Sequence, residues 1–151
     1  DLRQFFMTLQ ERLLDDMKTA MKSKDAETLG VLRMLKAALL NLEKESGEAG
    51  LDDAQVITAL QKEAKKRRDA IDSFVSGGRQ DLADVETAEL EIINRYLPAP
   101  FTDDEIRAII QEVIAGLDAP QFGSVMGPVM ARVSGRADGA VVKQLIQEQL
   151  Q

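Results

Sequence analysis

The residues best suited to bind a ligand form a basic cluster within LQKEAKKRRDAIDSF, residues 60–74. Five cationic side chains occur within seven positions, and the only acidic residue among them is Glu63. Cationic groups at this density can bind the phosphates of a nucleic acid. The basic cluster consists of Lys62, Lys65, Lys66, Arg67 and Arg68.

The basic cluster also has a purely structural interpretation. On a helix, Lys62, Lys65 and Lys66 share one face, whereas Arg67 and Arg68 share another, so the cations occupy two sides. Ion pairs with acidic neighbours would stabilise such a helix by only about 0.3–0.5 kcal/mol each. An arginine of the cluster could instead cover apolar surface with its stem. No aromatic residue is interleaved for base stacking, so we do not predict recognition of a specific RNA sequence.

A second feature is the turn GRADG at residues 135–139. Gly135 fits the left-handed position that ends a helix. Asp138 fits the N-cap of the next helix, where its carboxylate would accept from the N–H of Ala140 or Val141. A phosphate cradle needs free N–H groups at a helix N-terminus. The Asp138 carboxylate would occupy those groups and repel a phosphate. We therefore predict a connector between two helices, with Gly135, Asp138 and Gly139 as its turn residues.

Several classes of chemistry are excluded by composition. The 151 residues include no histidine and no cysteine, so the usual zinc sites, Ser-His-Asp triads and Cys-His dyads cannot form. The glycine-containing stretches at 47–50 and 76–81 lack the Lys-Ser/Thr that a Walker-type loop needs. The acidic residues 103–105 begin a helix and complement its dipole. We expect no catalytic residue, no metal site and no cofactor.

Charge and hydropathy limit the partners and the location. The net charge is −7, so any RNA binding would need a local basic patch. No apolar run approaches the roughly 18 residues of a membrane span, and no signal peptide is recognised. We expect a cytoplasmic protein without membrane contact. Residues 1–6 precede Met7, a natural start site, and are interpreted as an extension without a functional role.

The elements that would position these residues are helical throughout. Apolar residues recur at helical spacing in four stretches up to Leu97, with Asp25 and Asp52 as helix caps. YLPAPF then interrupts the pattern, because proline cannot continue a helix. We predict an all-α fold with three parts. These are an N-terminal four-helix domain at 7–97, a Pro-rich hinge at 98–101 and a small three-helix tail domain at 102–151.

The predicted tail domain combines a capped helix start with a proline inside its second helix. A capping box of Thr102 and Glu105 opens its first helix. The second helix, from about Phe122, contains Pro128, which costs about 3 kcal/mol inside a helix. We expect a kink there, or a helix that begins near Gly127. A unit of about fifty residues is marginally stable by size, so it would lean on the first domain or on a partner.

Three blocks of the sequence together resemble the YqeY-like family. They are LQERLLDDMKTAMKSKDAETLGVLRMLKAAL, ALQKEAKKRRDAIDSF with GGRQDLADVETAELEIINRYLP, and GSVMGPVMARVSGRADGAVVKQLIQEQL. The last fifty residues resemble the tail domain, called GatB/YqeY, of the B subunit of the tRNA-dependent aspartyl/glutamyl amidotransferase. Pro128 departs from the family pattern.

This resemblance implies a stand-alone GatB/YqeY-domain protein that binds tRNA as an accessory factor. Its protein partner would be the amidotransferase or an aminoacyl-tRNA synthetase. The carbon–nitrogen ligase chemistry, with glutamine as amido donor, belongs to other domains and subunits of that enzyme, and nothing in this chain matches them. The resemblance assigns the RNA-facing positions of the tail to Arg132, Arg136 and Lys143. The alternative is a protein–protein adaptor without an RNA role.

Overall fold

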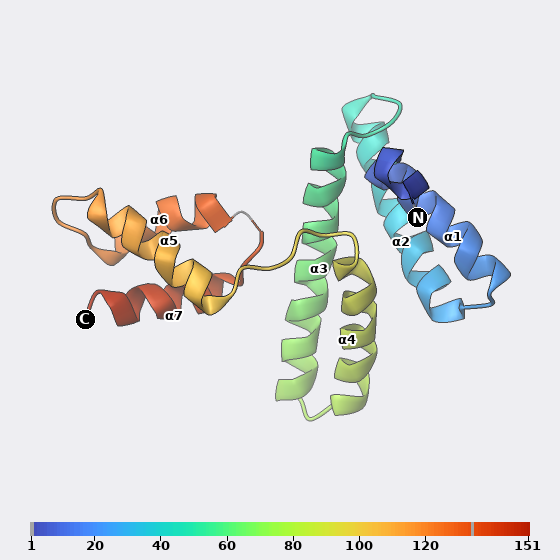
Figure 1. Ribbon diagram of the computed structural model, residues 1–151. Coiled ribbons are helices and arrows are strands. Elements are labelled where there is room, and N and C mark those ends of the chain that lie inside the picture. Colours follow the sequence, from blue (N-terminus) through green and yellow to red (C-terminus); the bar gives the residue numbers. More distant parts are fainter. Residues whose placement is uncertain (1, 134) are drawn as a thin grey trace. The chain divides into compact units, whose positions relative to one another are not determined.

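Figure 1 shows a computed structural model that describes residues 2–133 and 135–151. All regular structure in these residues is helical, so the predicted all-α class is confirmed. A short 3-10 helix, η1 (Leu2–Phe6), precedes the α-helices. The α-helices are α1 (Leu9–Lys22), α2 (Ala26–Ser46), α3 (Asp53–Ser76), α4 (Gln80–Asn94), α5 (Asp103–Ala115), α6 (Phe122–Val133) and α7 (Gly139–Gln149).

The chain divides into an N-terminal unit that ends at Leu97 and a tail unit that begins at Pro98. In the N-terminal unit, α3 and α4 form an antiparallel hairpin, and α1 pairs with α2 (Figure 1). Helix α2 also contacts α3 and α4, which joins the two pairs around one core. The fully buried large side chains of this core include Leu32, Leu35, Leu60 and Ile93.

The tail unit is a three-helix cluster in which each helix contacts the other two. Its core is made of branched aliphatic residues that recur at helical spacing on all three helices. The fully buried members are Ile106, Ile110, Val125, Val129, Val133, Val142 and Ile146.

Side-chain caps begin three helices at the predicted residues. The carboxylate of Asp25 accepts from the backbone N–H of Thr28 at 3.1 Å. Asp52 caps α3, and the Gln55 side chain accepts in return from the Asp52 N–H at 3.0 Å. Thr102 and Glu105 form the same reciprocal box at the start of α5. Each cap satisfies N–H groups that have no partner inside the helix.

Helix α6 begins at Phe122 and continues through Pro128, so the alternative of a start near Gly127 is wrong. Proline removes one backbone hydrogen bond and costs about 3 kcal/mol inside a helix. Val125, Val129 and Val133 are fully buried on one face of the helix. Burial of each valine is worth about 1.5–3 kcal/mol, and this burial outweighs the proline cost.

Some apolar residues that share the predicted helical stripes are exposed rather than buried. They include Met21, Val75 and Val85, each more than half exposed. Met21 and Val75 lie in the last turns of α1 and α3, where the neighbouring helices no longer cover them. None of the helices within the described residues is both long and apolar enough to span a membrane.

Candidate nucleic-acid interface

The basic cluster lies in the second half of α3, the helix that packs along α4. Lys62, Lys65 and Lys66 are exposed, whereas Arg67 and Arg68 are partly buried. This division follows from helical geometry, because the two arginines are on the side of α3 that turns toward neighbouring helices. The cluster therefore separates into three outward lysines and two inward arginines.

Arg67 connects three helices of the N-terminal unit. Its side chain is only 19% exposed, and its Nη1 lies 2.9 Å from Glu86 Oε2 and 2.8 Å from Glu89 Oε2 on α4. Its Nη2 contacts the sulfur of Met34 on α2. Arg67 thus holds the helices together, and we leave it out of the candidate interface.

The three lysines are held only weakly. Lys65 Nζ lies 3.0 Å from Asp69 Oδ2, and Lys66 Nζ lies 3.2 Å from Glu63 Oε1, both within α3. The Lys65–Asp69 pair is exposed on both sides and contributes about 0.3–0.5 kcal/mol, so a phosphate can replace Asp69 at little cost, whereas the Glu63 side chain is only 16% exposed. Within the described part of the chain, Lys62 has no ion-pair partner.

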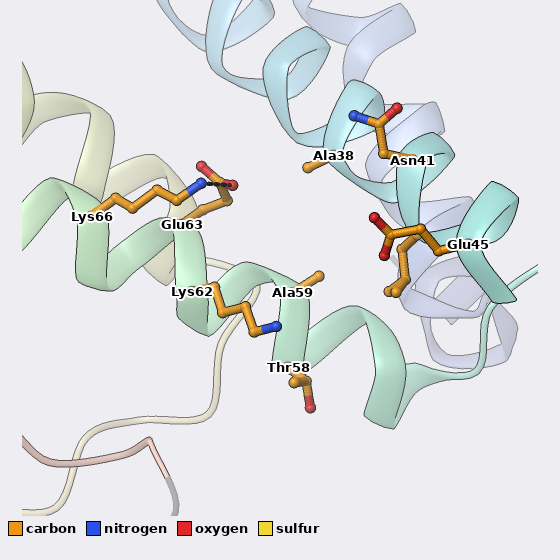
Figure 2. A pocket seen from close by; sticks show the side chains of 9 residues that line it. Ala38, Asn41, Glu45, Thr58, Ala59, Lys62, Glu63 and Lys66 are labelled. Atoms are coloured by element: carbon orange, nitrogen blue, oxygen red, sulfur yellow. Dashed lines mark hydrogen bonds and ion pairs between the residues drawn. The ribbon is translucent and has the colours of Figure 1, made fainter.

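A groove between α2 and α3 lies beside these lysines. Figure 2 shows Lys62, Glu63 and Lys66 on α3 facing Asn41 and Glu45 on α2. The groove has a volume of about 180 Å³. Its two ammonium groups are balanced by two carboxylates, so it concentrates no net positive charge. Lys62 and Lys66 therefore face Glu45 and Glu63 in this groove, whereas Lys65 does not line it.

In the tail unit, two of the three RNA-facing candidates are exposed. Arg132 on α6 forms an ion pair with Glu112 on α5, with Nη1 and Oε2 2.6 Å apart. Both side chains are about half exposed, so this pair also adds little stability. Lys143 is exposed on α7. Neither cation contributes to the tail core.

Arg136, the third candidate, is engaged within the tail unit and does not project freely from the turn. Its Nε donates to the carbonyl oxygen of Ala99 at 2.8 Å, and its guanidinium lies 3.9 Å from the centre of the Phe101 ring. The Phe101 N–H also donates to the Arg136 carbonyl oxygen at 2.8 Å. The flat guanidinium can stack on a ring and donate at its edge at the same time. Arg136 therefore ties residues 99–101 to the turn before α7.

The turn itself is built from local contacts. Gly135 adopts a left-handed φ of 77°, which favours glycine. Asp138 Oδ1 accepts from the Ala140 N–H at 2.9 Å and so caps α7. A Cβ at Gly139 would meet only the terminal methyl of Met130 at 3.8 Å, an ordinary contact. The N-terminus of α7 is thus occupied by a carboxylate and offers no free phosphate cradle.

The sequence did not reveal a polar pocket in the N-terminal unit, which lies between α1, the α1–α2 turn and the residues that follow α4. Its volume is about 270 Å³. Its members are separated by up to 84 positions in the chain, and on α1 they appear only as the polar side of an amphipathic helix. The charged and polar residues that line this polar pocket include Arg12, Asp16, Ser23, Asp25, Arg95 and Tyr96.

Within the described residues, no three acidic side chains converge to form a cation site.

The phenol of Tyr96 is the group whose pKa is most strongly shifted. Burial, together with the hydrogen bond to Asp16, raises its pKa far above the usual value. Tyr96 is therefore a neutral hydrogen-bond donor at physiological pH, not a base.

Comparison with known proteins identifies relatives of the whole chain. The family model described as Yqey-like protein matches residues 10–150. Altered inheritance of mitochondria protein 41 from Pyrenophora tritici-repentis is 32% identical over 142 residues, which is 91% of this chain and 78% of the fungal protein. Proteins of the same name from Eremothecium gossypii and Candida glabrata are 34% and 33% identical over 58% and 56% of this chain. The matched regions span about half of these two relatives, 48% and 47%.

These relatives correct the expected location. Each carries the word mitochondrial in its name, which contradicts the expectation of a cytoplasmic protein. That expectation rested on the lack of a long apolar run and of a recognised signal peptide. Neither absence distinguishes the cytoplasm from a compartment inside mitochondria, so the sequence pattern could not decide the location.

The family match runs from the second residue of α1 to just past the end of α7 and includes, apart from Leu9, all three sequence blocks that carry the resemblance. It also includes the basic cluster, the Pro-rich segment and the turn before α7. Fungal relatives that align with more than half of the chain support the same assignment. The chain belongs to the YqeY-like family.

Proposed function

We propose that this protein is an RNA-binding accessory factor whose RNA is tRNA. Its main phosphate contacts come from Lys62, Lys65 and Lys66 on α3. Arg132 and Lys143 provide a second, smaller set on the tail unit. The proposal for tRNA in particular draws on the likeness of the last fifty residues to the tail of the amidotransferase B subunit.

The observation that carries the proposal is the weak engagement of the α3 lysines. Lys65 and Lys66 make ion pairs only within this long, well-capped helix, and these pairs are not needed for its packing. A phosphate that displaces Asp69 gains a charge-assisted hydrogen bond and loses only a weak surface pair. The rigid helix keeps the lysines at fixed spacing, which lowers the ordering cost of binding.

The expected affinity is modest. Three phosphate contacts give a slope of log K against log salt of about −2 to −3. The net charge of −7 opposes approach of RNA to the rest of the surface. Useful binding in the cell therefore needs a second protein on the same RNA, and an amidotransferase or a synthetase would supply the catalytic groups that this chain does not offer.

A tRNA titration tests the proposal. Fluorescence anisotropy with labelled bulk tRNA at about 50 mM salt is compared for the wild type and for Lys62→Gln/Lys65→Gln/Lys66→Gln. We expect the triple variant to bind at least about tenfold more weakly and to lose most of the salt slope. The matched control, Lys18→Gln/Lys36→Gln/Lys44→Gln, removes the same charge from exposed positions of α1 and α2. Equal weakening by both triple variants, or no binding by the wild type at high micromolar protein, would overturn the proposal.

The tail contribution is tested separately. Arg132→Gln/Lys143→Gln should reduce tRNA affinity by a few fold, because two exposed cations are lost. Arg136→Gln should leave the affinity nearly unchanged, because that guanidinium already stacks on Phe101. A larger loss for Arg136→Gln than for the double variant would show that the stacked arginine rearranges to bind RNA.

The alternative, a protein–protein adaptor without an RNA role, is favoured by one observation. An apolar groove of about 200 Å³ lies between α1 and α2 and is lined in part by Leu14 and Leu40, which are 39% and 44% exposed. Nuclease-treated lysate distinguishes the two functions. A protein partner that is retained after nuclease treatment and lost with Leu14→Ser/Leu40→Ser would support the adaptor. Loss of the partner together with the RNA would favour the RNA-binding function.

A further inference from the structure

We propose that the polar pocket of the N-terminal unit binds a phosphate group, with Arg12 and Arg95 as its main ligands. The pocket lies between the middle of α1, the α1–α2 turn and the segment that follows α4. A cavity of about 270 Å³ is just below the usual range of about 300–1,000 Å³ for ligand pockets. It has room for a phosphate with a small attached group.

Both carboxylates of the pocket are already engaged by the protein. Asp16 Oδ2 accepts from the Tyr96 hydroxyl at 2.6 Å and lies 3.9 Å from Arg12 Nε. Asp25 accepts from the Thr28 N–H at 3.1 Å and also bonds the Thr28 side chain, which lowers the pKa of Asp25. Both carboxylates are therefore occupied, and they serve to orient their neighbours.

The arginines, in contrast, have donors to spare. The Arg12 guanidinium lies 4.9 Å from the centre of the Tyr96 ring, and its Nη2 donates to the Arg95 carbonyl oxygen at 3.2 Å. Its Nε is buried and has no hydrogen-bond partner among the described atoms. The Arg95 side chain is exposed, and within the described residues no hydrogen bond or ion pair engages its guanidinium. The Arg95 guanidinium is thus available to donate hydrogen bonds to an anion.

The residue between two lining residues of the pocket has an unusual backbone conformation. Lys24, between the lining residues Ser23 and Asp25, has a φ of 59° and is the only non-glycine residue with positive φ in the described part of the chain. The Asp25 N–H donates to Ala20 and the Lys24 N–H to Met21, at 2.9 and 3.3 Å, so Lys24 holds the helix-ending position that normally favours glycine. Non-glycine residues in this conformation are concentrated at functional sites.

The available charge suits a phosphate rather than a neutral ligand. The guanidinium groups of Arg12 and Arg95 line the pocket, and its two carboxylates already accept hydrogen bonds from protein groups. Tyr96 adds no charge, because its hydroxyl donates to Asp16. Guanidinium groups reach the pocket from two different elements, which suits a tetrahedral anion with several acceptor oxygens. The phosphate could belong to a small phosphorylated molecule or to an RNA backbone, and the inference does not rest on the proposed RNA function.

A two-dimensional amide NMR titration of the full chain with inorganic phosphate tests the inference at constant pH and ionic strength. We expect saturable shifts at the amides around Arg12, Ser23 and Arg95, with half-saturation in the millimolar range. Arg95→Gln should weaken this binding about tenfold, the effect of losing one charge-assisted hydrogen bond.

The matched control is Arg79→Gln. Arg79 precedes the first residue of α4 and Arg95 follows the last, so the two are about 24 Å apart along the helix. This control should bind phosphate as the wild type does. The absence of saturable shifts up to tens of millimolar phosphate, or equal weakening by both substitutions, would overturn the inference.

Two further titrations identify the source of the phosphate. If tRNA shifts the same amides and Arg95→Gln weakens that effect, the pocket binds the RNA backbone. If tRNA leaves these amides unmoved while ribose 5-phosphate shifts them, the ligand is a small phosphorylated molecule. The α3 triple variant keeps the two claims apart, because the α3 lysines do not line this pocket. If it loses tRNA binding and keeps the phosphate shifts, the result bears on the proposed function and leaves the pocket inference standing.

Discussion

The two units of this protein are stabilised by different kinds of contact. In the N-terminal unit, partly buried polar groups join helices that are distant in sequence, as Arg67 does with Glu86 and Glu89, and as Tyr96 does with Asp16. In the tail unit the core is aliphatic, and the ion pair that Arg132 forms with Glu112 on a neighbouring helix is exposed. The N-terminal unit therefore specifies its helix arrangement with polar contacts, whereas the tail unit depends on packing.

This difference bears on where function can reside. A polar pocket with oriented arginines needs a scaffold that holds partly buried charges, and the N-terminal unit shows such a pocket. The tail unit carries exposed cations on a small aliphatic core.

The largest expected effect tests whether the units are independent. Ile110→Ala and Ile93→Ala remove fully buried side chains from the tail and N-terminal cores. Each should cost about 2–5 kcal/mol of unfolding free energy. Tyr96, the only tyrosine in a chain without tryptophan, reports on the N-terminal unit by fluorescence, and far-ultraviolet circular dichroism reports on both. Ile110→Ala should lower the melting temperature seen by circular dichroism and leave the tyrosine transition in place. A joint shift would show that the units unfold as one.

The next effect concerns the polar contacts between α3 and α4. Arg67→Met keeps the apolar stem but leaves two glutamates without their shared cation. Because these side chains are 19–28% exposed, we expect a loss of about 1–3 kcal/mol, less than for a fully buried pair. Urea unfolding measures the change. Lys65→Met, which breaks only an exposed pair, should change stability by about 0.5 kcal/mol or less. Equal losses would show that Arg67 has no special structural role.

A third prediction concerns the Tyr96 hydroxyl. Tyr96→Phe removes its hydrogen bond to Asp16 at 2.6 Å. We expect a loss of about 1.5 kcal/mol at neutral pH, since the acceptor is charged but still partly solvated. Urea unfolding at pH 7 measures this loss. An unchanged stability would mean that water replaces the phenol at Asp16 without cost.

The same substitution changes the response to alkaline pH. Burial, followed by the hydrogen bond to Asp16, raises the pKa of Tyr96 in the folded state above its ordinary value of 10.0. Above pH 10 the unfolded chain loses the phenolic proton while the folded chain keeps it, so the folded state loses stability as the pH rises. Between pH 9 and 11 the wild type should therefore lose more stability than Tyr96→Phe. Parallel unfolding curves for the two proteins would contradict the raised pKa.

The smallest effect concerns the turn before α7. Asp138→Ala removes the cap on the Ala140 N–H and should cost the tail unit about 0.5–2 kcal/mol. Circular dichroism melting measures this cost, and Asp118→Ala, an exposed acid of the same unit outside the helices, is the control. An increase in tRNA affinity with Asp138→Ala would show that the freed helix N-terminus can bind phosphate after all.

Local features of the fold were predictable because they depend on neighbours in the sequence. Asp25, Asp52 and Thr102 were identified as caps from residue type and spacing, and the structure shows each accepting from the expected turn of helix. The alternative prediction of a helix that begins only near Gly127, because of Pro128, was wrong. The local cost of the proline was known, but the burial of the valines around it, which offsets that cost, depends on how α6 packs against α5 and α7.

The candidate sites show the same division between local features, which the sequence predicts, and contacts between distant segments, which it does not. Sequence spacing placed Lys62, Lys65 and Lys66 on one helical face, as the structure has them. It could not reveal that Arg136 stacks on Phe101, because thirty-five positions separate them in the chain. The polar pocket was missed for the same reason, since Arg12 and Arg95 become neighbours only when α1 lies beside the end of α4.

By itself the sequence determined the helical class, the caps, the family and the division of the basic cluster between two helical faces. Periodicity and capping involve residues within a few turns of each other, where backbone geometry alone relates them. Only the tertiary structure decided which cations are engaged and which are available. That choice depends on contacts between distant segments, and the packing of the apolar faces sets those contacts.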